Sequence, residues 1–175
     1  GGFGISSDNE KMKLNITKLA NLIDKIYHNS KFNISFEPGR YLVADAGFLV
    51  TKILTTKQNG GVNYLITDAG MHTFLRPAMY NASHKIVPFN QTGENNIYTV
   101  AGPICESSDI FANNINLPAQ QKDNLLIICG VGAYGSVMAS NYNSKCLPAE
   151  ILVNYNQYAI IRKQEKIETI IEKDL

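Results

Sequence analysis

The tetrapeptide Glu37-Pro38-Gly39-Arg40 follows a short β-leaning run and constrains the fold more than any other feature of the sequence. It sets a carboxylate, a rigid turn, an unhindered amide and a guanidinium at the end of a strand that we expect to be buried. The run Gly1-Gly2-Phe3-Gly4 has the same glycine-rich character. Two such strand ends side by side can hold one phosphate through backbone N–H groups, with Arg40 adding charge. We therefore expect an anion site here, with Glu37 facing the ring that carries the phosphate.

The segment between the two glycine runs has the periodicity of a helix. An amphipathic helix is predicted between residue 8 and about residue 28. Its apolar positions are Leu19, Leu22, Ile23, Ile26 and Tyr27. A glycine loop, a helix and a strand at residues 32–36 that ends in a functional loop form one α/β repeat of a parallel sheet or barrel. We assign residues 1–45 to such a unit.

The pattern changes after Asp45. Residues 48–56 and 62–67 alternate around Gly60-Gly61, which predicts a β-hairpin. Further strands are predicted at residues 84–89, 96–101, 124–129, 150–155 and 158–162, and a short final helix at residues 167–171. Their spacing, with Gly, Pro and Asn between them, predicts an antiparallel β-barrel or sandwich domain over residues 46–175.

Composition limits the classes of partner. The chain has 175 residues, is 45% hydrophobic and carries a formal net charge of +1, so nothing favours binding to nucleic acid or to an anionic membrane. No apolar run approaches the roughly 20 residues that span a bilayer. The three cysteines are odd in number and widely spaced, which favours a reduced, cytoplasmic protein. His28, His72 and His84 lack the spacing of metal ligands, so we treat them as ordinary surface or partly buried residues and expect no metal.

The start of the chain and its glycine run at residues 130–135 both bear on domain organisation. The chain opens inside a glycine loop with no initiating Met, which predicts that it is the carboxyl-terminal part of a longer protein. The run Gly130 to Gly135 fits G-x-G-x-x-G, but a dinucleotide site needs a long helix next. Residues 136–143 are polar and turn-rich instead, so we reject that reading.

Five motifs occur in order along the chain. They are EPGR at residues 37–40, DAG at 68–70 with RPxxY at 76–80, GPxCESxD at 102–109, GAYG at 132–135 and SxYN at 140–143. This series resembles the pyridoxal-phosphate decarboxylases of alanine-racemase-like fold, and within them most closely the diaminopimelate decarboxylases. The resemblance covers essentially the whole chain.

The resemblance implies a fold and a cofactor. It implies the last strand ends of a (β/α)8 barrel that binds pyridoxal 5'-phosphate, followed by a carboxyl-terminal β-domain that covers the site of a neighbouring subunit in a homodimer. The positions that it implies for the cofactor are Gly1, Gly2, Glu37, Pro38, Gly39, Arg40 and Tyr134. Glu37 would lie against the pyridine nitrogen, where a carboxylate favours the protonated ring.

The resemblance also implies a substrate with two acidic ends. Its substrate positions are Arg40, Arg76, Tyr80, Glu106 and Tyr134. Guanidinium binds carboxylate at two points, which suits Arg40 and Arg76, and Glu106 suits a distal ammonium. Cys105 resembles the proton donor to the α-carbon, because a free thiol is mostly protonated near neutral pH. Without the resemblance, Arg76 would be interpreted as a turn residue or a member of a surface ion pair, and Cys105 as a small buried apolar residue. We interpret Cys129 and Cys146 as small buried apolar residues.

The implied reaction is the decarboxylation of meso-2,6-diaminopimelate to L-lysine, the last step of lysine biosynthesis. Two alternatives stay open: a related decarboxylase acting on arginine, ornithine or carboxynorspermidine, and a non-catalytic fragment. In this family the lysine that binds the cofactor covalently lies in the amino-terminal part, and no residue here matches its motif. We therefore expect this chain to be inactive alone and to expose apolar surface on the helix around residues 19–27.

Overall fold

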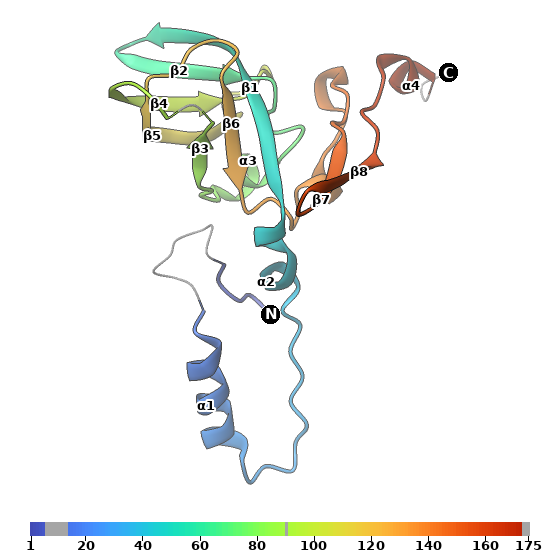
Figure 1. The fold of residues 1–175 in the computed structure, drawn as a ribbon. Helices are drawn as coiled ribbons and strands as arrows, with labels where there is room; N and C mark the ends of the chain where they lie inside the picture. Colours follow the sequence, from blue (N-terminus) through green and yellow to red (C-terminus); the bar gives the residue numbers. More distant parts are fainter. Residues whose placement is uncertain (6–13, 90, 173–175) are drawn as a thin grey trace.

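The computed structural model describes residues 1–5, 14–89 and 91–172, which form a six-stranded sheet, a separate two-stranded hairpin and several short helices (Figure 1). The strands are β1 (Phe48–Asn59), β2 (Val62–Thr67), β3 (Ile86–Pro88), β4 (Asn95–Ala101), β5 (Ile110–Pro118), β6 (Leu125–Cys129), β7 (Glu150–Asn154) and β8 (Gln157–Arg162). The helices are α1 (Ile16–Tyr27), α2 (Gly39–Val43), α3 (Arg76–Tyr80) and α4 (Ile167–Glu172), with 3₁₀ turns η2 (Ala44–Ala46), η3 (Ser136–Met138) and η4 (Tyr142–Ser144).

The six strands form a nearly closed barrel. Their order in the sheet is β3-β6-β1-β2-β4-β5. Among the described residues, neighbouring strands are antiparallel except β2 and β4, which pair in parallel. The two edge strands, β3 and β5, contact each other, so the sheet curls around one core. The largest fully buried apolar side chains of that core are Ile53, Leu65, Phe74, Val100, Leu126 and Ile128.

The hairpin of β1 and β2 shows why the sequence pattern succeeds here. Gly60 and Gly61 connect the strands with φ of +56° and +80°. A two-residue hairpin turn of this type needs both residues in the left-handed region, where glycine carries no steric penalty. The predicted hairpin is therefore confirmed. The predicted strands at residues 84–89, 96–101, 124–129, 150–155 and 158–162 and the final helix are also found, with ends shifted by a few residues.

The strand predicted at residues 32–36 is wrong. These residues form neither strand nor helix, and Phe32 is 79% exposed. A strand exists only where its N–H and C=O groups pair with a neighbour. No strand of the described chain pairs with this segment, so the β-leaning residues remain extended but unpaired.

Two features of the sheet were not predicted. Strand β5 is rich in asparagine, and its Asn114 has φ of +53°, so its sequence resembles a loop; pairing with β4 makes it a strand. The parallel pairing of β2 with β4 also differs from the expected all-antiparallel domain, because alternation along a strand does not reveal the direction of its neighbour.

Helix α1 stands apart from the sheet (Figure 1). Its N-cap is Asn15, whose side chain accepts a hydrogen bond from the Lys18 amide at 2.9 Å. Leu22, Ile26 and Tyr27 are exposed, as expected. The predicted helix began at residue 8, and residues 8–13 lie outside the described residues. None of the helices within the described ranges combines the length and the apolar character that crossing a membrane requires.

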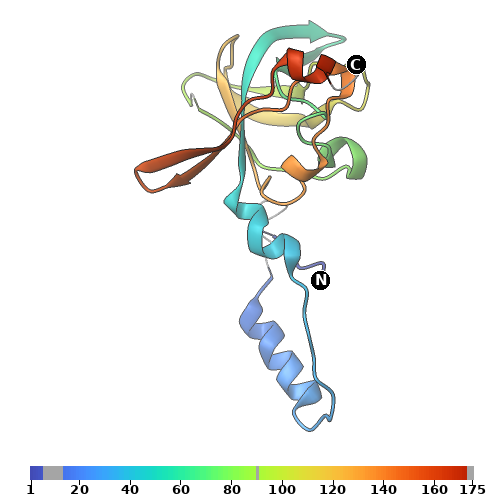
Figure 2. The same ribbon diagram turned by 90° about the vertical axis from the view of Figure 1, so that its right-hand side faces the viewer.

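The β7–β8 hairpin projects from the body of the domain (Figure 2). Apolar side chains are exposed on both of its faces, including Leu152, Val153 and Ile160. An ion pair between Arg162 Nη2 and Glu150 Oε1, 2.5 Å apart, joins its two strands near the base. Beyond this ion pair, the hairpin exposes apolar side chains on both of its faces.

Candidate functional site

The two glycine-rich segments lie next to each other, as the sequence predicted. Arg40 Nη2 donates to the carbonyl of Phe3 at 3.5 Å. A Cβ atom placed on Gly1 would lie 2.8 Å from the Glu37 carbonyl oxygen, so only glycine permits this approach. Gly2 has φ of +77°, in the region that favours glycine. The backbone of the first glycine segment, the Glu37 backbone and the Arg40 guanidinium therefore meet at one place, and Glu37 is exposed.

The GAYG loop is fastened to the chain that follows Arg40. The amides of Val131 and Gly132 donate to the carbonyls of Gly47 and Ala44 at 3.0 and 2.9 Å. Ile5, Ala44 and Ala133 are buried together in a small second core, with Tyr41 packed against it. The first glycine segment, the α2–η2 turn and the GAYG loop are thus held as one unit.

Tyr134 connects this unit to Arg76. Tyr134 has φ of +61°, and the Cζ atom of Arg76 lies 5.8 Å from the centre of its ring. That distance is within the range of a cation–π contact. Arg76 begins helix α3, and Tyr80 lies one turn later on the same helix face and is exposed.

Arg76 is buried, and no anionic side chain in the described part of the chain pairs with it. The residue is 9% exposed, and among the described residues no hydrogen-bond partner meets its Nη1 atom. Burying a guanidinium nitrogen without a partner is unfavourable. The site can therefore receive an acceptor that the described residues do not provide.

Asp109 joins the two loops that carry the DAG and GPxCESxD motifs. Its Oδ1 accepts from the Met71 amide at 2.6 Å and its Oδ2 from the Ile104 amide at 2.8 Å. Cβ atoms on Gly70 or Gly102 would lie 2.7 and 2.3 Å from its carboxylate. Burial raises the pKa of Asp109, and the two amide donors oppose that shift.

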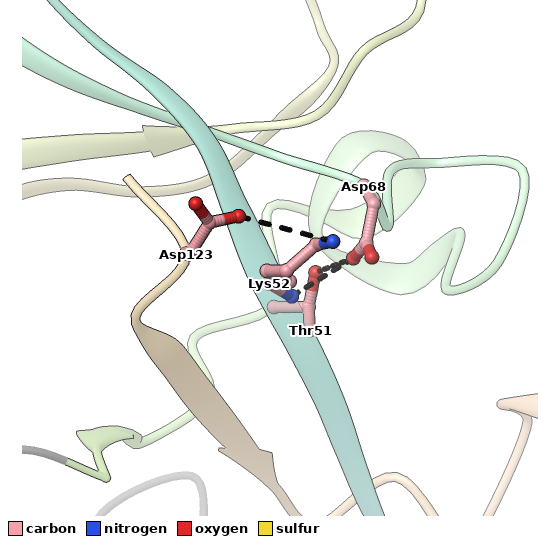
Figure 3. A network of polar contacts seen from close by, with 4 residues as sticks. All are labelled: Thr51, Lys52, Asp68 and Asp123. Carbon is pink, nitrogen blue, oxygen red and sulfur yellow. Dashed lines mark hydrogen bonds and ion pairs between the residues drawn. The ribbon is translucent and has the colours of Figure 1, made fainter. Parts of the chain in front are cut away.

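A second acid fixes the start of the DAG loop against strand β1 (Figure 3). Asp68 Oδ1 accepts from Thr51 Oγ1 at 2.6 Å and from the Lys52 amide at 2.9 Å. Thr51 Oγ1 in turn accepts from the Ala69 amide at 3.0 Å. Lys52 Nζ lies 3.9 Å from Asp123 Oδ1 on the other side of the strand. The loop that leads to Arg76 is therefore anchored before it leaves the sheet.

Cys105 and Glu106 form a separate group. Both are exposed, and Tyr142 Oη donates a hydrogen bond to Glu106 Oε1. This bond, and then the negative charge of Glu106, raise the pKa of Tyr142; Cys105 contributes a smaller effect. Within the described part of the chain, neither Cys105 nor Glu106 makes a hydrogen bond or ion pair with Arg40, Arg76 or Tyr134. One chain thus presents two groups of candidate residues.

Two histidines are more buried than the sequence suggested. His72 and His84 are 4% and 5% exposed, so treating them as surface or partly buried residues was wrong. His84 Nδ1 pairs with the Cys129 carbonyl at 3.0 Å, and its ring packs edge-on against Phe74. In the described ranges, no cluster of three or more His, Cys, Asp or Glu side chains is placed to hold a metal.

The glycines of residues 130–135 have a structural explanation. The segment that follows them is the 3₁₀ turn η3, not a long helix. A Cβ atom on Gly132 would lie 2.0 Å from the Val43 carbonyl oxygen, and one on Gly135 would lie 2.4 Å from the Val131 carbonyl oxygen. These glycines therefore permit close contact between backbone segments.

The sequence analysis did not predict the contacts that Asp109 and Tyr142 make. Both lie inside motifs that were recognised, GPxCESxD and SxYN, but no role was assigned to either. The sequence shows only that Asp109 ends one polar motif and that Tyr142 lies inside another. The partners of each are far away in sequence, which a motif cannot show.

The chain thus combines a nearly closed sheet domain, a buried guanidinium in one of its loops and a glycine-rich segment beside Arg40. Residues 40–132 match the family described as pyridoxal-dependent decarboxylase, C-terminal sheet domain. The chain belongs to this family.

Relatives of the chain are longer than the chain itself. It is 34% identical to the diaminopimelate decarboxylase of Zymomonas mobilis over 175 residues, which are 99% of this chain and 42% of that protein. It is 44% identical to the Deinococcus radiodurans diaminopimelate decarboxylase over 134 residues, 77% of this chain and 35% of that one. The crystal structure of diaminopimelate decarboxylase from Helicobacter pylori complexed with L-lysine superposes with a TM-score of 0.88 at 38% identity, covering 100% of this chain and 44% of that one.

The residues at the glycine cradle fit a phosphorylated cofactor. Gly1 and Gly2 are exposed and lead into Phe3, whose carbonyl accepts from the Arg40 guanidinium, and a Cβ on Gly1 would clash with the Glu37 carbonyl oxygen. Backbone amides and a guanidinium are the donors that a phosphate requires. Glu37 lies beside them with an acceptor suitable for a ring nitrogen.

Proposed function

We propose that the full-length protein containing this chain decarboxylates meso-2,6-diaminopimelate to L-lysine with pyridoxal 5'-phosphate. The observation that carries this proposal is the buried guanidinium of Arg76, whose Nη1 has no partner among the described residues. A second carboxylate on the substrate would supply that partner. Substrates with only an amine at the distal end, such as ornithine, would leave the nitrogen unsatisfied.

In this proposal, residues 1–45 complete a (β/α)8 barrel and residues 46–175 form the sheet domain. Gly1, Gly2, Gly39 and Arg40 hold the phosphate, with Pro38 fixing the turn. Glu37 and Tyr134 contact the cofactor ring. When bound, the cofactor supplies the electron sink that permits loss of carbon dioxide.

The remaining residues act on the substrate. Arg76, assisted by Arg40, Tyr80 and Tyr134, binds the distal carboxylate. Glu106 binds the distal ammonium.

Cys105 supplies the proton that the reaction needs. Its Sγ–H donates the proton that replaces the departing carboxyl group on the α-carbon. The thiol is exposed and therefore accessible to a substrate.

We further propose that the full-length protein is a cytoplasmic homodimer whose active site is shared between subunits. Among the described residues of one chain, no hydrogen bond or ion pair joins Cys105 or Glu106 to Arg76, which supports a shared site. The cysteines are all free, which supports a reducing compartment.

The test replaces Arg76 with Lys in the full-length protein. Lysine retains the charge but not the two-point geometry, so KM for diaminopimelate should rise by about 10- to 100-fold, corresponding to roughly 1.4–3 kcal/mol. The matched control is Arg162→Lys, which makes the same change in the Glu150 ion pair of the β7–β8 hairpin and should leave KM unchanged. Faster turnover of ornithine than of diaminopimelate by the wild-type protein would refute the proposal.

A further inference from the structure

Tyr142 contacts a carboxylate to which a substrate role has been proposed. Its Oη donates to Glu106 Oε1, and the two residues come from loops 36 positions apart in sequence. Both side chains are exposed, with Tyr142 at 44%. A carboxylate accepts several hydrogen bonds, so the bond from Tyr142 leaves Oε2 of Glu106 available for another donor.

The loop that carries Tyr142 is held at several points. The Ser140 amide donates to the His72 carbonyl at 2.8 Å. Asn141 Nδ2 donates to the Lys145 carbonyl at 3.0 Å and also to the Glu165 carboxylate. The Leu147 amide donates to Glu165 Oε2 at 3.1 Å. These bonds fix both ends of the loop and leave the tyrosine ring at its tip.

The backbone at the tip is in an uncommon conformation. Asn143 and Ser144 follow Tyr142 with φ of +57° and +54°. Non-glycine residues in this region are disfavoured and persist where the surroundings impose them. A loop that only connected η3 to β7 would not need two such residues in succession. The turn presents the Tyr142 hydroxyl to the GPxCESxD loop.

The plain alternative is an incidental surface hydrogen bond. Two observations weigh against it: the anchored loop and the chemistry of the pair. A tyrosine hydroxyl that keeps its proton is a lasting donor, and the Glu106 bond raises the pKa of Tyr142 and so keeps it protonated. A donor on one oxygen restricts the rotation of the carboxylate.

We propose that Tyr142 is a positioning residue that orients the Glu106 carboxylate toward the distal ammonium group of the substrate, and thereby contributes to selection of a diamino acid. This inference rests on the proposed function, in which Glu106 binds that ammonium. It assigns to the SxYN loop a role in specificity that is separate from binding of the distal carboxylate by Arg76.

The test compares two ligands in the full-length protein loaded with its cofactor. Diaminopimelate has the distal ammonium, whereas 2-aminopimelate has both carboxylates and lacks it. In Tyr142→Phe we expect KM for diaminopimelate to rise roughly fivefold with kcat within about twofold, because one hydrogen bond to a charged group is lost. The inhibition constant of 2-aminopimelate should not change. A purely structural defect would weaken both ligands together.

The controls separate this inference from the proposed function. Tyr155→Phe makes the same change at the 96% exposed tip of the β7–β8 hairpin and should change neither constant. In a Glu106→Gln background, Tyr142→Phe should add no further effect. Thermal unfolding of each variant checks that the fold is retained.

Each outcome has one meaning. If Glu106→Gln leaves the preference for diaminopimelate over 2-aminopimelate unchanged, the proposed role of Glu106 fails and the inference fails with it. If Glu106→Gln removes the preference but Tyr142→Phe does not reduce it, only the positioning role is overturned. Equal weakening of both ligands by Tyr142→Phe also overturns it.

Discussion

Replacing Gly132 with alanine should destabilise the protein far more than its position at the surface suggests. Gly132 is exposed, and exposed substitutions usually change stability by less than about 0.5 kcal/mol. An added Cβ would, however, lie 2.0 Å from the Val43 carbonyl oxygen, 2.9 Å from the Gly47 nitrogen and 3.0 Å from the Ala44 carbonyl oxygen. All three atoms belong to the backbone, so no side chain can rotate away.

The expected cost has two parts. Forcing a methyl group into a closely packed contact costs about 1–3 kcal/mol. The backbone must separate to relieve the clash, which weakens the bonds from the Gly132 amide to Ala44 (2.9 Å) and from the Val131 amide to Gly47 (3.0 Å). Each such bond contributes about 0.5–1.5 kcal/mol. The free energy of unfolding should therefore fall by about 2–6 kcal/mol.

Urea unfolding of the full-length protein measures this difference. The matched control is Gly39→Ala, because no atom lies within 4 Å of a Cβ placed there. Gly39 also lies in helix α2, where alanine is the better helix former, so its variant should be as stable as wild type or slightly more stable. Equal stability of Gly132→Ala and wild type would show that the GAYG loop and the α2–η2 turn are not in contact.

Two further predictions concern buried polar groups. Asp109→Asn should lower the free energy of unfolding by about 1–3 kcal/mol, although it removes a buried charge, because the amide has one acceptor oxygen for the two N–H donors of Met71 and Ile104. The control is Asp123→Asn, at an exposed position whose φ of +68° asparagine tolerates. In the same urea titration it should cost less than about 0.5 kcal/mol. Burial, then the charge of Lys145, lower the pKa of His72 from 6.5, while Asp68 opposes the shift. The unfolded state therefore takes up the proton first, so the stability contributed by His72 is complete above pH 6.5 and is lost as the pH falls below it. Urea midpoints measured across this window should decline less steeply for His72→Gln, and an unchanged slope would contradict the assignment.

The sequence predicts the local features of the fold better than its pairings. Gly60 and Gly61 determine the β1–β2 hairpin through their own backbone preferences, which is why that element is found as predicted. Strand β5 depends on β4 as a partner, and its asparagines give no local signal of that pairing. Residues 32–36 show the converse, since a β-leaning sequence forms no strand where nothing pairs with it.

The candidate site divides in the same way. The motifs correctly indicate that Arg40 lies beside the first glycines, because both segments carry recognisable turn chemistry. They do not show that Arg76 is buried against Tyr134 or that Asp109 accepts the amides of two loops. Those contacts depend on segments that only the closed sheet brings together.

The parallel pairing of β2 and β4 has a consequence for the order of folding. The connection between these strands, residues 68–94, carries helix α3 with Arg76 and visits the far edge of the sheet as β3 before returning. Contacts between segments so distant in sequence form late, because a long loop must close first. We therefore expect the connection that carries Arg76 to reach its final arrangement only after β4 has closed this loop by pairing with β2.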